Sequence, residues 1–363
     1  MQRNILMVID SLRMGGAERI ALTLTELFLK ENIAVDIITI YDYVEYTIPE
    51  NVNIYTLNYK KRYFQNTIYS YKLTNKIKSL EQEHGKPYDL VLVHLLKSSR
   101  LMKFYKHKHL YFVIHNAMSN EVMQNMSGLK RNRQLKRMQK KYNNKNLITV
   151  SQGVSEDLLS QMHIKPKSIQ VIYNPIDKQQ INLLANDKNV AEENLPYIIH
   201  IGRFEAQKRH DLLIDAYVKS KIEAKLLLVG DGTLKQEIES QVKRLSLEEK
   251  VIFQGRHKNP YPILKEASLL VLSSDFEGLS MVLLEALALG VRVVSRDCPS
   301  GPREILEGYL DKALVPMNDL DMFASMIQEQ YTNPSKISPQ ILDRFNGHFV
   351  IQQYMALMEK IDD

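Results

Sequence analysis

The chain has 363 residues, of which 44% are hydrophobic and 25% are charged, and its one cysteine is Cys298. These values are typical of a soluble chain long enough for two domains, and a lone cysteine excludes an internal disulfide and fits a reducing compartment. No run of eighteen apolar residues occurs, and the short polar start leads straight into an apolar segment, so we expect neither a transmembrane helix nor a signal peptide. A cytoplasmic location is therefore expected.

The net charge of +6 is unevenly distributed along the chain. Residues 97–145 contain thirteen Lys or Arg and a single acid, Glu121, which gives this region a charge of +12. The rest of the chain is then acidic, at about −6. The positive charge of the chain is thus concentrated in this region, and a function of this region should explain it.

The first predicted element is a buried parallel strand over residues 4–10, followed by a turn at Gly15 and Gly16 and a helix that ends near Lys30. Backbone amides at a Gly-Gly turn can approach an anion closely, with the helix dipole behind them. Gly15 and Gly16 are therefore candidate donor-binding residues, although such a pair is more often a plain turn. The turn lacks the G-x-G-x-x-G pattern of dinucleotide-binding proteins.

Strands and a helix continue to alternate through the first half of the chain, which indicates an α/β fold with a parallel sheet. Open sheets of this kind bind ligands beyond the carboxyl ends of their strands. His115 ends one of these strands, so we expect its side chain in a ligand cleft, although a lone histidine is as often structural. The expected strands are 35–40, 52–57, 89–94, 110–115, 147–151 and 168–172, and the expected helix is 66–82.

Residues 119–145 are predicted to form one long amphipathic helix, with Val122, Met126, Leu129, Met138 and Tyr142 on its apolar face. A solvated helix is the plain alternative, but so many like charges repel each other unless an anionic partner is close. An anionic membrane surface or a lipid phosphate fits this pattern. Nucleic acid is an alternative but is disfavoured, because no aromatic residues interleave the charges. The basic face consists of Lys130, Arg131, Arg133, Lys136, Arg137, Lys140 and Lys141.

A second series of strands follows Pro175 and a polar, Asn-rich stretch over residues 181–194. Arg203 comes directly after the strand 197–202, and Lys208 opens the next helix. An arginine offers a planar fork and a lysine a point charge, and together they suit a diphosphate. Surface basic residues are usually only solvated, so the assignment of these two as ligand contacts needs further evidence from the rest of the sequence.

The most informative stretch is residues 274–290, a strand end, a tight turn and a short helix closed by Gly290. The helix is apolar at every position except Glu285, so we expect it to be buried. A buried carboxylate is costly unless it is hydrogen-bonded, and a pair of ligand hydroxyls would satisfy it.

Glu277 precedes the same helix, and the amides of residues 279–283 would form an anion site between the two acids. Two carboxylates beside a positive helix end suit a nucleotide-sugar. In the plain alternative, Glu277 is a solvated loop acid and Glu285 pairs with a Lys or Arg. The predicted donor contacts in this turn are Glu277, Gly278, Leu279, Ser280, Met281 and Glu285.

The spacing of Glu277 and Glu285, followed by Ala286, resembles the E-x7-E motif of the GT4-like family of retaining GT-B glycosyltransferases. The Gly202-Arg203 pair with Lys208 resembles the phosphate-binding residues of that family. The loop 301–305 is similar to a loop of bacterial polysaccharide transferases.

This resemblance implies an α/β GT-B fold, with two Rossmann-like parallel-sheet domains that face each other across a cleft. The expected domains are 1–174, completed by a C-terminal crossover helix over 346–363, and 175–345, which would bind the donor.

The resemblance also assigns roles. Arg203 and Lys208 would hold the leaving diphosphate, Glu277 the hydroxyls of the transferred sugar, and Glu285 the ribose diol. His115 would lie near the transferred sugar, so that the expected catalytic residues are Glu277, His115, Arg203 and Lys208. Arg256, after the glycine that closes the strand 251–255, would be a contact of the nucleobase.

A metal cofactor is not expected. Asp319-Leu320-Asp321 matches the D-x-D pattern of metal-dependent transferases, but it begins a C-terminal helix, where an acid caps the first turn. No Cys or His cluster has the spacing of metal ligands.

The predicted function is transfer of a hexose or N-acetylhexosamine, with retention, from a UDP-linked donor to a lipid-linked or cell-surface glycan in polysaccharide or lipopolysaccharide biosynthesis. The enzyme would be a hexosyltransferase, peripheral on the cytoplasmic face of an anionic membrane. A GT-B nucleotide-sugar epimerase and a non-catalytic nucleotide-sugar-binding protein stay open as alternatives. A nicotinamide oxidoreductase is disfavoured by the missing glycine fingerprint.

Overall fold

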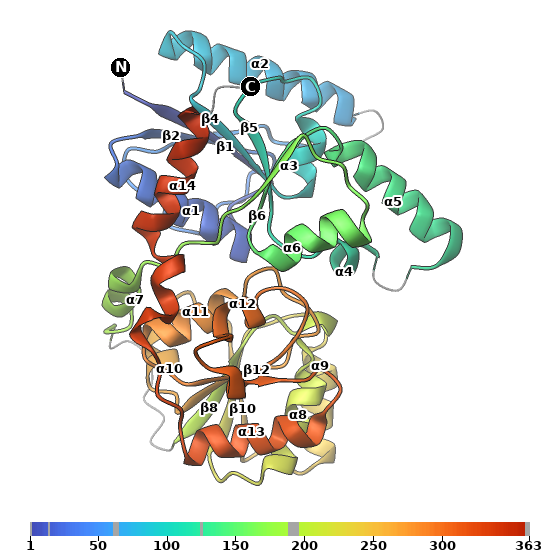
Figure 1. The fold of residues 1–363 in the computed structure, drawn as a ribbon, viewed down its shortest axis with the longest axis vertical. Coiled ribbons are helices and arrows are strands. Elements are labelled where there is room, and N and C mark those ends of the chain that lie inside the picture. Colours follow the sequence, from blue (N-terminus) through green and yellow to red (C-terminus); the bar gives the residue numbers. More distant parts are fainter. Residues whose placement is uncertain (1, 14, 61–64, 124–125, 188–195, 360–363) are drawn as a thin grey trace. The chain divides into compact units, whose positions relative to one another are not determined.

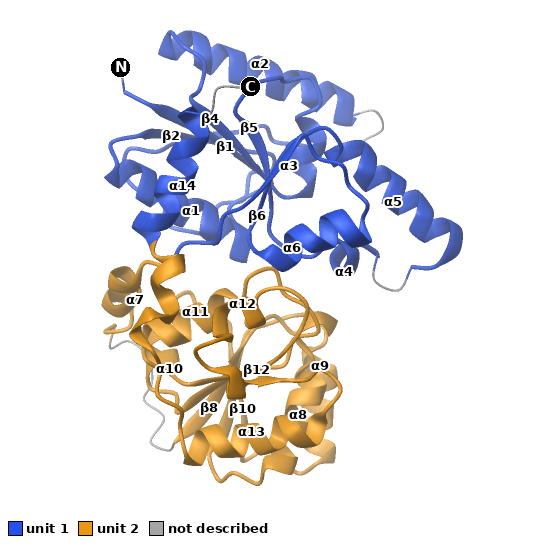
Figure 2. Cartoon of the chain, in the orientation of Figure 1, with its two compact units in different colours: residues 1–175, 347–363 blue, residues 176–346 orange. Residues whose placement is uncertain are grey.

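The computed structural model describes residues 2–13, 15–60, 65–123, 126–187 and 196–359 (Figure 1). The chain forms two compact units, Met1–Pro175 with Gly347–Asp363, and Ile176–Asn346 (Figure 2). Each boundary lies one residue from the position expected from the sequence.

Unit 1 is built on a seven-stranded parallel sheet in the order β3-β2-β1-β4-β5-β6-β7. Its strands are apolar runs that helices cover, as expected for a parallel sheet. The strands are β1 (Asn4–Ile9), β2 (Ala34–Thr39), β3 (Asn53–Thr56), β4 (Leu90–His94), β5 (Leu110–Ile114), β6 (Asn146–Thr149) and β7 (Ser168–Val171). The helices are α1 (Gly16–Lys30), α2 (Gln65–His84), α3 (Leu96–Leu101), α4 (Met118–Met123), α5 (Gly128–Tyr142), α6 (Gln152–Glu156), the π-turn η1 (Asp157–Gln161) and α14 (Gly347–Glu359).

The C-terminal helix α14 belongs to unit 1 and lies beside α1 (Figure 1). The ring of Tyr354 meets that of Phe28 edge to face, with centroids 6.1 Å apart. Arg3 and Glu359 form an ion pair of 2.9 Å at the end of the helix. Tyr354 and Phe28 are both buried, so the end of the chain completes the core of the first unit.

Unit 2 contains a six-stranded parallel sheet in the order β10-β9-β8-β11-β12-β13. Its core includes Ile198, Leu228 and Leu269 from the sheet and Leu213 and Phe323 from the helices α8 and α13. The strands are β8 (Tyr197–Ile201), β9 (Lys225–Val229), β10 (Val251–Gly255), β11 (Leu269–Leu272), β12 (Val293–Arg296) and β13 (Leu314–Val315). The helices are α7 (Lys178–Leu184), η2 (Ala206–Lys208), α8 (His210–Ser220), α9 (Lys235–Arg244), α10 (Tyr261–Lys265), α11 (Met281–Ala288), α12 (Pro302–Leu306), η3 (Asp311–Ala313), α13 (Leu320–Thr332) and η4 (Pro339–Phe345).

The D-x-D sequence is a helix cap, as predicted. The carboxylate of Asp319 accepts a hydrogen bond of 2.8 Å from the amide of Met322 at the start of α13. Asp321 lies in the first turn of that helix.

The single long helix predicted over residues 119–145 is wrong. The chain forms α4 and then α5, whose N-cap Ser127 is extended and whose first residue, Gly128, has a φ of +55°. The spacing of apolar residues does not reveal a glycine whose backbone dihedral angles are not helical. As a consequence, Leu129 does not join the buried face of α5, which contains Met138 and Tyr142, and 88% of Leu129 is exposed.

No helix within the described ranges is long and apolar enough to cross a membrane.

Candidate active site

In unit 2, the strand order reverses between β8 and β11, and open α/β sheets bind ligands at such a point. Arg203 follows β8 by two residues, and Lys208 ends η2 just beyond it. Glu277 follows β11 on the other side of the reversal. Arg203 is exposed, and its guanidinium has no ion-pair partner among the described residues. The three predicted residues therefore follow the two strands at which a ligand is expected.

Lys208 and Glu277 form an ion pair, with 2.7 Å between Nζ and Oε1. The hydroxyl of Ser274 donates to the same oxygen at 2.6 Å. Glu277 is 7% exposed, so its carboxylate is held in place and largely removed from water. Gly202 makes room for the lysine stem, because a Cβ there would lie 3.3 Å from Lys208 Cγ and Cδ. The sequence predicted both charges but not their pairing.

The turn before α11 is shaped by a neighbouring glycine. Gly301 has a φ of +85°, and a Cβ on it would lie 3.1 Å from Leu279 Cα and 3.2 Å from the Ser280 amide nitrogen. Ser280 is 2% exposed, and its hydroxyl has no hydrogen-bond partner in the described structure. This close packing fixes the backbone at the start of the helix.

The predicted run of free amides over residues 279–283 is one residue too long. The amide of Leu283 donates to the Ser280 carbonyl at 3.2 Å, which closes the first turn. The amides of residues 279–282 make no hydrogen bond to any residue that the structure describes. They remain available to an anion at a positive helix end.

Glu285 is buried, as the apolar helix predicted, with 7% of the residue exposed. Sequence reasoning missed one of its partners. The hydroxyl of Tyr261 on α10 donates to Glu285 Oε1 at 3.1 Å. A tyrosine at the start of a helix gave no signal for this contact, because the two residues are far apart in the sequence.

The loop between β11 and α11 is braced by a buried arginine that was not predicted. Arg296 is 4% exposed and donates to Asp275 at 2.7 Å, to the Ser273 carbonyl at 2.8 Å and to the Met317 carbonyl at 2.6 Å. Arg209 approaches Asp275 from the other side, at 3.3 Å. A charged residue at the end of an apolar strand is a signal that could have indicated this role.

The remaining donor-side candidates are Arg256 in unit 2 and the two glycines in unit 1. Arg256 directly follows β10 and is exposed. Gly15 is the N-cap of α1 in unit 1, where a Cβ would lie 2.3 Å from Glu18 Oε2, and Gly15 accepts a hydrogen bond from Tyr46 at 3.1 Å. A Cβ on Gly16 would meet no described atom within 4 Å. A Cβ at position 15 would only displace the flexible end of the Glu18 side chain, so packing requires a glycine at neither position.

His115 follows β5 in unit 1 and contacts a second histidine, His94, which ends β4. The distance between His94 Nδ1 and His115 Nε2 is 2.9 Å. Burial lowers the pKa of His115 to about 4 and holds the pKa of His94 well below its usual range. His115 is therefore neutral near pH 7.

Lys141 does not belong to the exposed basic face. Its ammonium donates to the Leu96 carbonyl at 3.1 Å, and burial, with a smaller effect from Arg100, lowers its pKa to about 8. Asp10, at the end of β1, accepts from the amide and hydroxyl of Ser98, and burial raises its pKa. The last turn of α5 thus places Lys141 against the start of α3 in the same unit. The sequence predicts an exposed charge at this position.

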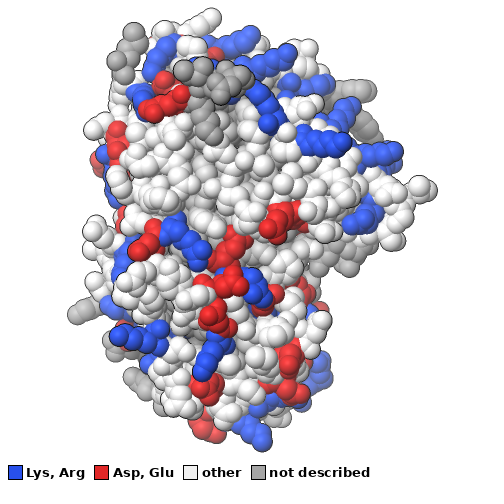
Figure 3. Space-filling view, viewed as in Figure 1, with Lys and Arg blue, Asp and Glu red and all other residues white. Residues whose placement is uncertain are grey.

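The other six residues of the basic face are exposed. In Figure 3, Lys and Arg side chains gather over α2 and α5 with few acids among them. We call the exposed set the α5 basic face: Lys130, Arg131, Arg133, Lys136, Arg137 and Lys140.

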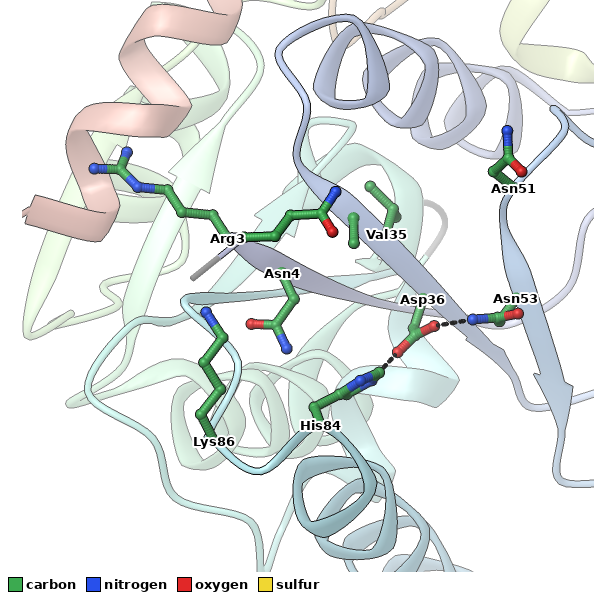
Figure 4. A pocket seen from close by; sticks show the side chains of 10 residues that line it. Arg3, Asn4, Val35, Asp36, Asn51, Asn53, His84 and Lys86 are labelled. Atoms are coloured by element: carbon green, nitrogen blue, oxygen red, sulfur yellow. Dashed lines mark hydrogen bonds and ion pairs between the residues drawn. The ribbon is translucent and has the colours of Figure 1, made fainter.

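A cavity of about 310 Å³ in unit 1 contains none of the predicted residues (Figure 4). It lies at the amino ends of β1 and β2, opposite the edge where open sheets bind ligands. Asp36 in its wall is 4% exposed and accepts from Tyr88 at 2.6 Å, His84 at 2.8 Å and Asn53 at 3.0 Å. This carboxylate ties α2, β2 and β3 together.

Replacing Asp36 with Ala should lower the free energy of unfolding by about 2 kcal/mol, because the buried Tyr88 hydroxyl would lose its acceptor, and the more exposed His84 and Asn53 would lose theirs. Chemical denaturation of the full chain measures this loss. Asp42→Ala, at an exposed acid of the same unit, is the matched control and should change stability by less than about 0.5 kcal/mol. Equal stability of the two variants would contradict the structural role of Asp36.

Within the described parts of the chain, no group of three or more His, Cys, Asp or Glu residues could hold a metal ion. Cys298 is buried, and burial raises the pKa of its thiol.

Two parallel Rossmann-like sheets and a buried acid pair after β11 are features of glycosyltransferases with the GT-B fold. Residues 184–343 match the family model of glycosyl transferases group 1, and residues 14–180 match that of glycosyltransferase family 4. The chain belongs to the GT4-like glycosyltransferases.

Two relatives are informative. The N-acetylgalactosamine-N,N'-diacetylbacillosaminyl-diphospho-undecaprenol 4-alpha-N-acetylgalactosaminyltransferase of Campylobacter jejuni is 31% identical over 93% of this chain and 94% of its own length. The lipopolysaccharide 1,6-galactosyltransferase of Salmonella typhimurium is 28% identical over 54% of this chain and 56% of its own length.

A solved structure with the same fold is HepE of Anabaena in complex with UDP and glucose. It has a TM-score of 0.75 at 20% identity and covers 99% of this chain and 100% of its own.

Proposed function

We propose that the protein is a retaining hexosyltransferase that moves a hexose or N-acetylhexosamine from a UDP-linked donor to a lipid-linked or cell-surface glycan. The observation that carries this proposal is the arrangement after β8 and β11. There, an ion pair between Lys208 and the buried Glu277 follows two adjacent strands, together with an exposed Arg203 and the amides of residues 279–282, which bond to no described residue. Cations and amides suit a diphosphate, and a fixed carboxylate suits sugar hydroxyls.

Each side chain has a role in this proposal. Arg203, Lys208 and the amides bind the leaving diphosphate, and Glu277 orients the hydroxyls of the transferred sugar. Glu285 binds the ribose diol, and Arg256 lies near the base. His115 in unit 1 contacts the transferred sugar.

The reaction needs stabilisation of separating charge more than it needs a protein base. As the bond from the anomeric carbon to the phosphate oxygen breaks, negative charge grows on the diphosphate, and fixed cations and amides stabilise it there. The departing phosphate oxygen takes the proton of the acceptor hydroxyl, which attacks from the same face, so that configuration is retained. No divalent metal takes part, and we expect transfer to continue in the presence of EDTA.

A lipid-linked acceptor is supported by two observations. The Campylobacter relative is named for a diphospho-undecaprenol substrate. The α5 basic face offers six exposed cations, with the exposed Leu129 next to Lys130 at the start of the helix. Such a helix suits the surface of an anionic leaflet.

Reversing three charges of the α5 basic face should weaken binding to vesicles that contain anionic lipid by about tenfold or more. Each basic residue close to such a surface contributes about 1 kcal/mol, and each reversal also adds repulsion. Sedimentation of Lys136→Glu/Arg137→Glu/Lys140→Glu with phosphatidylserine vesicles measures this loss.

The control is Lys243→Glu/Arg244→Glu/Lys250→Glu, which makes the same charge change on exposed residues of unit 2. If both triple variants sediment equally well, the membrane role of α5 is refuted.

A panel of nucleotide-sugars tests the proposed reaction. We expect one UDP-sugar to bind, to be hydrolysed slowly alone, and to release UDP faster when a lipid-diphosphate glycan is added. Interconversion of UDP-sugars without an acceptor would instead identify an epimerase. Binding with no UDP release under any condition would identify a non-catalytic binding protein.

A further inference from the structure

Two histidines meet at the carboxyl edge of the sheet in unit 1. Strands β4 and β5 are neighbours, and their register pairs His94 with Val113, two residues before His115. The rings lie nearly parallel, with centroids 5.1 Å apart and an angle of 27° between their planes. The 2.9 Å from His94 Nδ1 to His115 Nε2 is a hydrogen-bond distance.

Both rings are neutral, so the pair shares its hydrogens in one of two ways. Burial lowers the pKa of both imidazoles below the physiological range. Each neutral ring then carries a hydrogen on one nitrogen only, and the two tautomers differ in which nitrogen can donate. Either His94 donates from Nδ1, or His115 donates from Nε2.

The surroundings of His94 decide between these arrangements. His94 is 0% exposed, and its Nε2 has no hydrogen-bond partner in the described structure. If His115 donated, His94 would carry its hydrogen on this Nε2, as a buried N–H without an acceptor. If His94 donates, the unpartnered atom is only a lone pair. Buried N–H groups without an acceptor are rarer in proteins than under-satisfied acceptors.

We propose that His94 is a positioning residue that donates its Nδ1–H to His115 Nε2 and thereby fixes His115 as the Nδ1–H tautomer. The Nδ1 of His115 makes no hydrogen bond to any described residue, and His115 is partly exposed. His115 therefore offers a ligand a hydrogen-bond donor and no free lone pair. It binds an oxygen, such as that of a sugar hydroxyl, and does not remove a proton.

The tautomer can be observed directly by NMR on the full chain labelled with ¹⁵N-histidine. In the wild type, we expect the ¹⁵N chemical shifts of His115 to show a protonated Nδ1 and an unprotonated Nε2. In His94→Phe, we expect His115 to revert mainly to the Nε2–H form that imidazole favours in water. In His94→Asn, an amide nitrogen replaces Nδ1 and should restore the wild-type pattern.

His163→Asn is the matched control, because His163 is an exposed histidine of the same unit, and it should leave His115 unchanged. The inference is refuted if His115 is Nε2-protonated in the wild type, or if His94→Phe leaves its tautomer unaltered. Thermal unfolding of each variant shows whether the fold is retained, and His94→Asn keeps the test available should the phenylalanine variant not fold.

The consequence for catalysis rests on the proposed function. In UDP-sugar turnover, kcat should fall about tenfold in His94→Phe, which corresponds to one hydrogen bond, and should recover in His94→Asn. The NMR result does not depend on turnover. A chain that shows the expected tautomer but transfers no sugar would refute the proposed function and leave the histidine arrangement standing.

Discussion

Lys208→Ala should lower kcat for sugar transfer by about 10²–10³-fold, the typical loss when one fixed group that stabilises transition-state charge is removed. Lys208 is held 2.7 Å from Glu277, and its stem passes Gly202 without a clash. The ammonium is therefore already in place when charge grows on the diphosphate. The change also leaves a buried carboxylate with the Ser274 hydroxyl as its neighbour, so Glu277 itself should become less well positioned.

The measurement is steady-state release of UDP, together with thermal unfolding to separate catalysis from stability. Lys243→Ala, on the exposed surface of unit 2, is the control and should retain wild-type kcat. In a double-mutant cycle, Lys208→Ala/Glu277→Gln should be far less impaired than the product of the two single effects, because the residues act as a pair. Fully additive losses would show that the ion pair does not act as a unit.

Glu285→Gln should weaken donor binding by about 10–100-fold, the effect of one or two hydrogen bonds to a charged group. Glutamine keeps the shape of the side chain and an oxygen to accept from Tyr261, so the fold should be preserved. Tyr261→Phe removes only the supporting hydroxyl, 3.1 Å from Glu285, and should weaken binding by a few-fold at most.

Titration calorimetry with UDP compares the two variants. A larger loss in Tyr261→Phe than in Glu285→Gln would contradict a direct contact between Glu285 and the nucleotide.

The strands and the buried helix around Glu285 could be predicted because their signals are local. Apolar runs identify parallel strands, and an apolar helix with a single acid identifies a buried carboxylate. Asp319 was predicted correctly as a cap for the same reason, since a cap depends on the next few residues only.

Features that depend on the order of strands could not be predicted in the same way. Lys208 and Glu277 are 69 positions apart, and their pairing follows from β8 lying next to β11. Tyr261, Arg296 and His94 likewise acquire their partners only once the sheets form. A pattern of residue types can single out a residue such as Arg296, but it does not identify the partner.

The prediction for α5 failed for a different reason. Helical periodicity predicts Leu129 on the buried face of the helix and Lys141 on the exposed face. The backbone at Gly128 departs from the helical conformation, and the last turn of α5 packs against the start of α3. Leu129 is consequently exposed and Lys141 partly buried, the reverse of the prediction. The two errors thus have separate causes, the backbone at Gly128 for Leu129 and the contact with the Leu96 carbonyl for Lys141.

A nucleotide that lacks the ribose hydroxyls tests the assignment of Glu285 most directly. Calorimetric titration should show that the wild-type protein binds UDP at least about tenfold more tightly than 2′,3′-dideoxy-UDP, and that Glu285→Gln abolishes this preference. Equal affinity of the wild type for both nucleotides, or a preference that survives in Glu285→Gln, would show that this buried carboxylate does not bind the ribose.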